Sequence, residues 1–588
     1  MKLRLLPLRA SLLPSALLLA ATLSALAADA PVPKPANATV ALIRSLAESG
    51  ALKPEAVAAL VAQAEADAAA QDAAIKAAVA AALATQQPSA PPVAAPVPEG
   101  TVRVTYIPAP VRAQMMEELR HEVLTQAAEE NWAAPRTFPD WVARFRLFGD
   151  VRVRYEGDNF PAGNDNTGAF PNFNAINTGA PFDVTGSAFS PQLNVDQNRA
   201  RARLRARLGF AVDLEEGFTS GLRLATGESN SPVSTNQSLG LAGSGQGGQF
   251  SKYALWLDRA FVRYDRPGAP GQSLSASLGR FENPFFSTDV LWDDDIGLDG
   301  LAVQGRAPVG DTVTPFFAVG AFPVFNTDFN FASIQPAKFK STDKWLYAAQ
   351  AGADWQARGD TSLKFAAAFY DFAGVEGKLS SPFTPTSAAD QGDTDSRRPS
   401  FAQKGNTYMA LRNITPSALN GFGTTNQFQY FGLATPFRDL ALTVRLDFNR
   451  YAPVQISLLG EFVTNLAFSR SAIAAKAVNN LGPGGAGDFV GGGDAWMLGL
   501  KVGHAALDKS GDWNAGLVWR RVESDSVIDG FTDSDFGGGG TNLQGWSLSA
   551  AYALSRRVSL AARWMSADSI AGPAYKNDIL QLDLTAKF

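Results

Sequence analysis

The stretch Arg199–Val212 alternates between charged and small apolar residues. Its arginines are Arg199, Arg201, Arg203, Arg205 and Arg207, with alanine or leucine between them. Successive side chains of a β-strand point to opposite faces, so the stretch predicts a strand with one basic and one apolar face. An α-helix would scatter the same arginines around its surface and leave no apolar stripe. Taken alone, the pattern suits a membrane barrel, a soluble sheet or an arginine-rich arm that binds nucleic acid.

Alternation of this kind recurs from about residue 138 to the end of the chain. In one example Leu442 and Val444 share one face of a strand, and Thr443 and Arg445 share the other. We predict sixteen strands from such patterns. They are Arg144–Tyr155, Arg199–Val212, Phe218–Thr226, Lys252–Tyr264, Ser273–Arg280, Gly300–Val303, Thr312–Ala321, Trp345–Ala357, Thr361–Phe372, Ala441–Phe448, Val454–Asn465, Ala495–Gly503, Gly511–Arg521, Leu543–Leu554, Val558–Met565 and Ile579–Phe588.

Short and long connections alternate between these strands. Arg450–Pro453 is short, whereas 156–198 and 373–440 are long and rich in Gly, Asn, Asp and Ser. Tight turns on one rim and long loops on the other are typical of an outer-membrane barrel, and an even number of strands closes the sheet. We therefore predict an all-β membrane protein with a closed antiparallel transmembrane barrel of 16 strands over 138–588. A further hairpin around Thr407–Ile414 and Phe428–Ala434 would make it 18.

The charged faces distinguish a membrane barrel from a soluble sheet. Arg152 and Arg154 share a face of the first strand, and the five arginines of the second strand follow. An apolar core cannot bury so many charges, but a water-filled lumen accommodates them while the apolar face contacts lipid. We expect all seven arginines to line the pore. Aromatic residues near strand ends fit the membrane interface; they are Tyr155, Tyr264, Trp345, Trp355, Trp519 and Trp564.

Residues 1–27 have the organisation of a secretory signal peptide. A basic start precedes the apolar run Leu12–Leu23 and the small residues of a cleavage site at Ala25–Ala27. The run is too short to span a membrane, which argues against an N-terminal anchor. We expect residues 28–110 to form an alanine-rich helical segment and a proline-rich linker in the periplasm. An amphipathic helix follows within 111–137, either as a coiled coil or packed on the barrel.

Composition narrows the possible chemistry. The chain has 588 residues, a net charge of −5, no cysteine and two histidines, His121 and His504. The mild negative charge argues against a dedicated nucleic-acid partner. Without cysteine and with so few histidines, zinc sites and histidine-assisted nucleophilic catalysis are disfavoured, so we expect no enzyme activity, metal or cofactor. The glycine runs Gly491–Gly493 and Gly537–Gly540 lie in long connections and read as flexible loop.

Five longer motifs are more specific than the strand pattern. They are FRLFGDVRVRYEGDNF (145–160), NRARARLRARLGF (198–210), GLRLATGESNSPVSTNQSLG (221–240), WLDRAFVRY (256–264) and GRFENPFFSTDVLWDDDIGLDGLAVQ (279–304). Together they resemble the family of large β-barrel porins of proteobacterial outer membranes, over most of the chain from about Val111. The resemblance implies insertion into outer-membrane lipid of a Gram-negative cell and passive diffusion of small hydrophilic solutes. The terminal Phe588 resembles the C-terminal signal that the barrel-assembly machinery recognises.

Loop 281–299 differs from the other long connections because it is both aromatic and acidic. Its apolar residues include Phe285 and Trp292. Its acidic residues are Asp289, Asp293, Asp294, Asp295 and Asp299. Trimeric general-diffusion porins fold their third loop into the barrel, so by analogy we expect a homotrimer in which Asp293–Asp295 face Arg201–Arg207 across a constriction. Alternatively, the loop packs over a rim or on a neighbouring subunit, or its aspartates bind Ca²⁺.

These observations leave several functions open. Passive diffusion of solutes or ions through an arginine-lined barrel is the interpretation we favour. A substrate-selective anion channel is one alternative, although the ladder arginines could instead pair with acids on neighbouring strands. A structural barrel with a plugged lumen, tethered to the envelope by its N-terminal helices, is another. A soluble carbohydrate-binding sheet is the third.

Overall fold

The computed structural model describes residues 142, 144–179, 191–241, 248–423, 427–482 and 485–588. The predicted signal peptide (1–27), the predicted alanine-rich segment (28–110) and the predicted helix region (111–137) all lie outside the described residues. Among the residues described, no helix is both long enough and apolar enough to cross a membrane.

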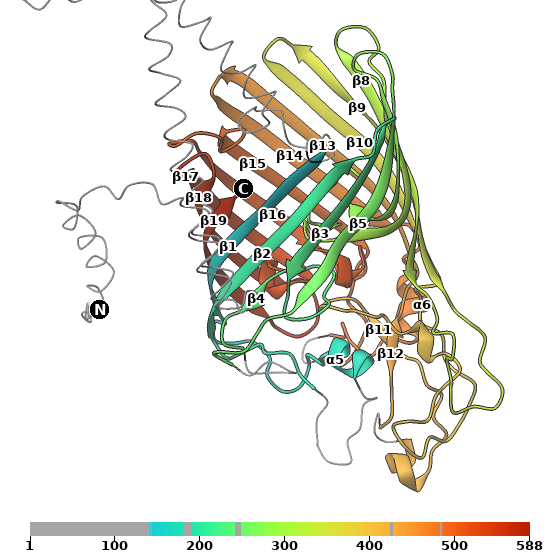
Figure 1. Cartoon of the computed structure of the whole chain (residues 1–588). Coiled ribbons are helices and arrows are strands. Elements are labelled where there is room, and N and C mark those ends of the chain that lie inside the picture. The colour runs from blue at the N-terminus through green and yellow to red at the C-terminus, as the bar shows by residue number, and fades with distance from the viewer. Residues whose placement is uncertain (1–141, 143, 180–190, 242–247, 424–426, 483–484) are drawn as a thin grey trace, which may run out of the picture. The chain divides into compact units, whose positions relative to one another are not determined.

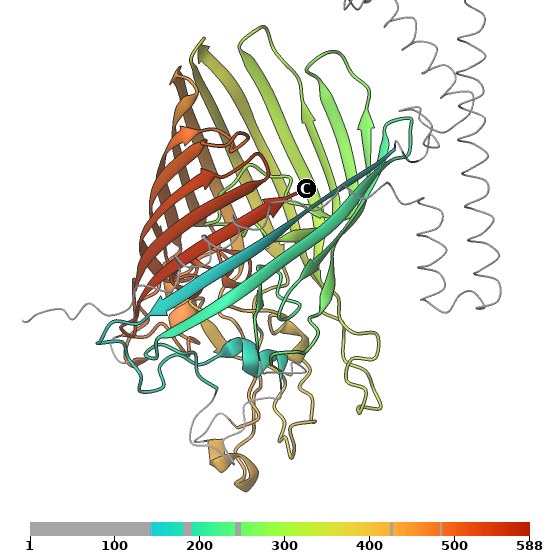
Figure 2. The ribbon, with the colours of Figure 1, turned by 60° about the vertical axis from the view of Figure 1, so that its left-hand side comes forward.

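Sixteen long strands form one closed antiparallel barrel (Figures 1 and 2). They are β1 (Phe145–Asn159), β2 (Arg199–Asp213), β3 (Phe218–Thr226), β5 (Leu255–Arg266), β6 (Ser273–Glu282), β7 (Gly297–Arg306), β8 (Val313–Phe325), β9 (Lys344–Arg358), β10 (Thr361–Ala373), β13 (Phe437–Tyr451), β14 (Val454–Asn465), β15 (Asp494–His504), β16 (Trp513–Val522), β17 (Leu543–Ala553), β18 (Val558–Ser569) and β19 (Lys576–Lys587). Each strand pairs with the next, and β19 returns to β1. The predicted sixteen-stranded barrel is confirmed.

The predicted extra hairpin forms, but outside the barrel sheet. β11 (Tyr408–Ala410) and β12 (Phe431–Leu433) pair only with each other in a separate two-stranded sheet. Each has three residues, too few to cross a membrane, where a strand needs about 9–11. The eighteen-strand alternative is therefore wrong. The remaining short elements are β4 (Gln237–Ser238), which pairs with β2, the helices α5 (Phe173–Thr178) and α6 (Arg470–Ala474), and the 3₁₀ turns Asp395–Arg397, Ala418–Gly423, Asp529–Phe531 and Phe536–Gly538.

The long connections gather at one end of the barrel and the tight turns at the other (Figure 1). We number the long connections as loops in chain order, so that residues 283–296 are the third loop, 374–436 the fifth and 523–542 the seventh. Long loops face the cell exterior in barrels of this kind, and tight turns face the periplasm.

Side-chain exposure shows which face of the sheet is apolar. On β13, Leu442 and Val444 are 47% and 43% exposed, whereas the neighbouring Ala441 and Thr443 are 1% exposed. Leu580, Leu582 and Leu584 of β19 are likewise exposed on the outside. Large apolar side chains on the outer surface are unfavourable in water but favourable against lipid, as an outer-membrane barrel requires.

The last residue of the chain extends the pairing of β19 with β1 that closes the barrel. The backbone N–H and C=O of Phe588 exchange hydrogen bonds of 3.1 and 3.0 Å with Gly149 of β1. The phenyl ring of Phe588 lies over Gly149, where an added Cβ would stand 2.6 Å from the ring and 2.4 Å from the carbonyl oxygen of Arg207. Because Gly149 has no side chain, the ring of Phe588 can pack against the backbone of β1.

We predict that Gly149→Ala destabilises the barrel by about 1–3 kcal/mol, because the methyl group overpacks this closure. The measurement is the temperature at which the folded, fast-migrating band is lost on a semi-native gel. Gly460→Ala in β14 is the matched control, since the nearest atom to its added Cβ is 3.8 Å away. Equal losses for the two variants would show that the contact with Phe588 does not seal the barrel.

Candidate functional site

The arginines of β1 and β2 point into the lumen and alternate there with acids. Arg205 and Arg207 bind Asp150 at 2.9 and 2.6 Å, and Arg201 binds Glu156 at 2.5 Å. Neighbouring positions on adjacent strands share a face, so the acids of β1 lie among the arginines of β2. Arg199 donates to the carbonyl of Asn198. Most of the arginine ladder is therefore paired with acids on the neighbouring strand.

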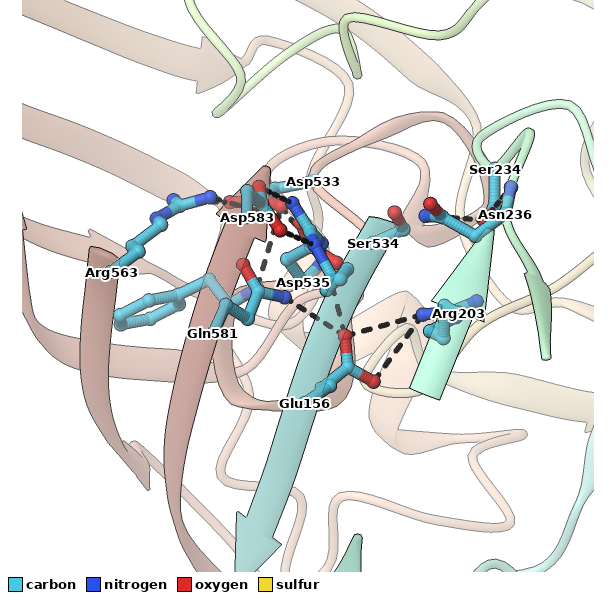
Figure 3. Close-up of polar contacts among 12 residues, drawn as sticks. Glu156, Arg203, Ser234, Asn236, Asp533, Ser534, Asp535, Arg563, Gln581 and Asp583 are labelled. Atoms are coloured by element: carbon cyan, nitrogen blue, oxygen red, sulfur yellow. Dashed lines mark hydrogen bonds and ion pairs between the residues drawn. The ribbon is translucent and has the colours of Figure 1, made fainter. Parts of the chain in front are cut away.

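Arg152, Arg154 and Arg203 continue this network toward β19. Arg154 binds Asp583 of β19 at 2.8 Å, and Arg203 lies 3.3 Å from both oxygens of Glu156. Arg152 donates to Asn236 at 2.6 Å. The seven arginines that we expected to line the pore thus lie on adjacent strands, and six of them contact carboxylates. Figure 3 shows one such contact, between Arg203 and Glu156.

The third loop crosses the interior of the barrel. It leaves from β6, the fifth strand around the barrel, and its Asp289 binds Arg520 of β16, the thirteenth of sixteen, at 2.8 Å. These two strands are half a circumference apart. Near the start of the loop, the amide of Gln350 on β9 donates to and accepts from the backbone of Phe286, both at 2.8 Å. Side chains on opposite sides of the barrel therefore hold the loop inside the lumen.

Apolar residues of the third loop have the packing partners that their composition required. Phe285, Leu291 and Trp292 are buried in a core that includes Tyr370 and Phe372 of β10. The ring of Trp292 lies 5.5 Å from that of Tyr370. Residues of the fifth and seventh loops, among them Tyr408 and Ile528, belong to the same core. The long-loop half of the lumen is therefore filled on this side by protein.

The seventh loop is a part of the site that the sequence analysis missed. Its backbone joins the third loop through Asp293 N–H to Phe531 C=O at 2.8 Å and Asp533 N–H to Asp289 C=O at 3.0 Å. Its acids reach the barrel strands: Asp533 binds Arg520 at 2.7 Å, and Asp535 binds Arg154 at 2.9 Å. Burial alone would raise the pKa of Asp535, but Arg154 and Arg563 lower it below its usual value.

The glycine run of the seventh loop is ordered around a lysine. Gly537–Gly540 all have positive φ, a conformation that glycine adopts without steric cost. The ammonium of Lys404 donates to the carbonyls of Gly537 and Gly539 and lies 4.7 Å from the centre of the Tyr575 ring. Burial lowers the pKa of Lys404 to about 7. The expectation of a merely flexible run is wrong at Gly537–Gly540.

The five aspartates expected to form a constriction have different surroundings. Asp295 faces the ladder, 3.5 Å from Arg207 and 3.8 Å from Arg205, and accepts two hydrogen bonds from Thr235. Asp294 is exposed and makes no hydrogen bond or ion pair with the described residues. Asp289 faces the far side of the barrel at Arg520.

The other two aspartates do not face the arginine ladder. Asp293 is 8% exposed and accepts hydrogen bonds from the backbone N–H groups of Asp295 and Ser534 inside the contact between the two loops. Asp299 lies in β7 on the same outer face as Leu301 and binds Arg280 at 2.8 Å. Of the aspartates expected to face Arg201–Arg207, Asp295 lies beside Arg205 and Arg207, whereas Asp293 does not, because backbone N–H groups hold its carboxyl group.

The aspartates of the third loop do not form a binding site for a divalent cation with the described residues. In the described part of the chain, no group of three or more His, Asp or Glu side chains is placed to hold a metal ion. The carboxylates of Asp293 and Asp295 have separate partners, which does not favour the Ca²⁺ alternative for the third loop.

Cavities remain between the third loop and the tight-turn rim. One of about 570 Å³ is lined by residues such as Arg146, Arg223 and Phe261, and one of about 430 Å³ by residues such as Arg306 and Lys364. The interior is thus divided into a filled apolar side and an open side bordered by charge.

A closed barrel with an apolar exterior and a charged interior defines a transmembrane β-barrel of the outer-membrane type. Within this class the chain belongs to the porin family described as "Putative porin", which matches residues 36–588. Membership makes it an outer-membrane channel protein.

Similar folds occur in solved outer-membrane proteins. The channel DcaP of Acinetobacter baumannii is 12% identical, with a TM-score of 0.34 over 76% of this chain and 97% of that chain. Pseudomonas putida OprB at high pH is 12% identical, with a TM-score of 0.39 over 76% and 96%. Salmonella typhi OmpF in complex with daunomycin is 9% identical, with a TM-score of 0.34 over 76% and 97%. No curated protein matches the chain.

We predict that Arg520→Gln releases the third and seventh loops. The substitution leaves Asp289 and Asp533 without their buried counter-charge, and breaking such a pair costs about 3–5 kcal/mol. The measurement is urea unfolding in detergent micelles, followed by the loss of the folded gel band. Arg521→Gln is the matched control because Arg521 binds Glu523 at the barrel rim and is half-buried. A loss no larger than that of the control would contradict a central role for Arg520.

We predict that Asp293 makes the barrel less stable as the pH rises. Burial, and then repulsion by Asp533 and Asp295, raises the pKa of Asp293 from 3.8 to about 9 in the folded protein. The unfolded chain loses this proton first, so this group lowers stability progressively between about pH 4 and pH 9 and no further above that. Asp293→Asn should remove this slope and stabilise the barrel at pH 8 by about 1–2 kcal/mol.

The measurement for Asp293 is the unfolding temperature in micelles at pH 6, 8 and 10. Asp311→Asn is the control, since Asp311 lies exposed in the tight turn between β7 and β8, away from the third and seventh loops. An unfolding temperature for Asp293→Asn that follows the wild-type slope would show that another group causes the pH dependence.

Proposed function

We propose that the protein lets small hydrophilic solutes and ions diffuse passively across the outer membrane through a lumen narrowed by the third loop. The observation that carries this proposal is the position of Asp295, on a loop that crosses the lumen, 3.5 Å from Arg207 on the barrel. Opposite charges on two sides of a narrow aqueous passage create a transverse field that orients polar solutes.

The open side of the lumen supports a passage for polar molecules. The side chains of Arg201 and Arg563 remain 43% and 27% exposed despite their ion pairs. Asp294, which precedes the paired Asp295 in the sequence, is also exposed. Hydrated ions and polar solutes find charged partners here that are weak enough to release them.

Pairing within the ladder weakens the proposal of a dedicated anion channel. Asp150 and Glu156 neutralise much of the charge of Arg201, Arg205 and Arg207. A track of arginines favours anions only to the extent that its charge is free. We therefore propose a channel with modest selectivity rather than one built for anions alone.

A structural barrel with a plugged lumen is the second candidate. It is favoured by one observation: the third, fifth and seventh loops share an apolar core inside the barrel. If this core extended across the whole lumen, the loops would block the barrel permanently. The cavities beside the charged strands favour the channel instead.

We also propose an assignment for the chain ends. β1 begins and β19 ends at the tight-turn rim, which faces the periplasm in such barrels. This supports a periplasmic position for residues 28–137 and a role for Phe588 in recognition by the barrel-assembly machinery. Outer-membrane lipid and two further copies of the chain in a homotrimer remain our proposed partners.

The first test is single-channel conductance of the purified protein in planar bilayers. We expect ohmic steps, and we expect the double variant Arg205→Gln/Arg207→Gln to shift the reversal potential in a KCl gradient toward cation selectivity, because Asp150 and Asp295 then lose their counter-charges. Arg144→Gln is the control, since Arg144 binds Glu215 at the tight-turn rim. An absence of steps from a folded barrel would favour the plugged structural protein. An unchanged reversal potential would show that Arg205 and Arg207 do not border the path of the ions.

A further inference from the structure

The cavity of about 430 Å³ between the third loop and the tight-turn rim combines aromatic rings with an excess of positive charge. Its volume is within the range of roughly 300–1,000 Å³ typical of sites for small molecules. It is bordered by Phe286 of the third loop, Phe316 of β8, Lys364 of β10 and Arg306 of β7. Phe316 and Lys364 occupy inward-facing positions, because the adjacent Phe317 and Phe365 are exposed on the outside. Arg306 lies opposite Phe316 in the β7–β8 register and therefore shares its face.

The two phenyl rings are held in place by backbone features of β9. Phe316 lies beside Gly352 on the adjacent strand, where an added Cβ would stand 2.5 Å from the ring. Glycine at this position therefore lets the ring lie flat across β9. Phe286 is positioned by the two hydrogen bonds between its backbone and the Gln350 amide. An apolar surface is thus built into this side of the lumen.

Cations outnumber acids around these rings, because Arg263, Arg306 and Lys364 line the cavity with one acid, Asp354. The ammonium of Lys364 lies 4.6 Å from the centre of the Phe286 ring and 4.8 Å from that of Phe316, and its nearest acid, Asp354, is 4.0 Å away. Arg306 stands directly across from Phe316 in the β7–β8 register and has no hydrogen bond or ion pair among the residues described. Arg263, also at the cavity, is paired with Asp265. The net charge that meets a solute here is positive.

We propose that this cavity binds small aromatic carboxylates as they pass through the lumen. The ring of such a solute stacks on Phe286 and Phe316, while its carboxylate binds Lys364 and Arg306. Aromatic rings prefer offset or edge-to-face contact with one another, and a carboxylate matches the fork of a guanidinium. A plain inorganic anion would use the charges but not the rings, and a neutral aromatic alcohol would use the rings but not the charges. The proposal rests on the proposed channel function and names a class of solute for it.

The test is block of the KCl current by benzoate in planar bilayers, with acetate, benzyl alcohol and benzylammonium as comparison probes. The KCl current itself tests the channel, so its absence counts against the proposed function and not against the site. Benzoate is expected to reduce the current reversibly at concentrations at which the other three probes have no effect. Equal block by acetate would mean that charge alone acts, equal block by benzyl alcohol that the rings alone act, and either result would overturn the proposal.

Substitutions at the cavity test whether benzoate blocks the current by binding there. Lys364→Gln and Phe286→Leu are each expected to raise the half-blocking benzoate concentration about fivefold to tenfold, in line with loss of one charged or one aromatic contact. Lys501→Gln is the matched control, because Lys501 faces the lumen from β15 and does not border this cavity. Retention of the folded gel band shows that each variant forms the barrel. Benzoate block that persists in both site variants, or that is lost equally in Lys501→Gln, would overturn the assignment.

Discussion

The buried guanidinium of Arg520 links the parts of the interior that would otherwise be independent. Its side chain is 3% exposed and binds Asp289 of the third loop and Asp533 of the seventh loop at 2.8 and 2.7 Å. A lone cation at this depth would be strongly unfavourable, so both acids are needed, and each brings its loop with it. Arg563 of β18 adds a second contact to Asp533 at 3.4 Å. The position of Asp295 opposite Arg207 follows from this anchoring, because the same loop carries both aspartates.

The barrel could be predicted from the sequence because its pattern is local. Leu442 and Val444 alternate with Thr443 and Arg445 within a few residues, and such alternation determines which side chains face lipid. Strands Phe218–Thr226 and Val454–Asn465 have the predicted bounds. The hairpin near Tyr408 shows the limit of this reasoning, because strand propensity does not tell whether a short strand joins the barrel or a loop.

The site was less predictable because its contacts join residues far apart in the sequence. Asp289 and Arg520 are separated by more than two hundred positions, and nothing near either residue identifies the other. Asp533 and Asp535 stand in a glycine-rich connection that looked flexible. One signal was present: Arg520 and Arg563 occupy inward positions and needed acids from some loop. The conformation of Gly537–Gly540 depends on Lys404 in another loop, so composition alone could not separate an ordered cage of carbonyls from a flexible run.

The interior of this barrel is asymmetric, and the asymmetry follows from the side chains that face inward. Leu346, Tyr370 and Phe437 of β9, β10 and β13 are apolar and nearly inaccessible, which is favourable only if other apolar groups cover them. The third, fifth and seventh loops supply those groups. On β1 and β2 the inward positions are charged, so water and ion pairs suit them better than a loop does. Because both requirements act in one lumen, the loops lie against the apolar strands and the aqueous space is left beside the arginines. In the channel that we propose, the path of a polar solute would therefore depend on which strands carry apolar inward residues, with the ion pairs at Arg207 and Arg520 at its edge.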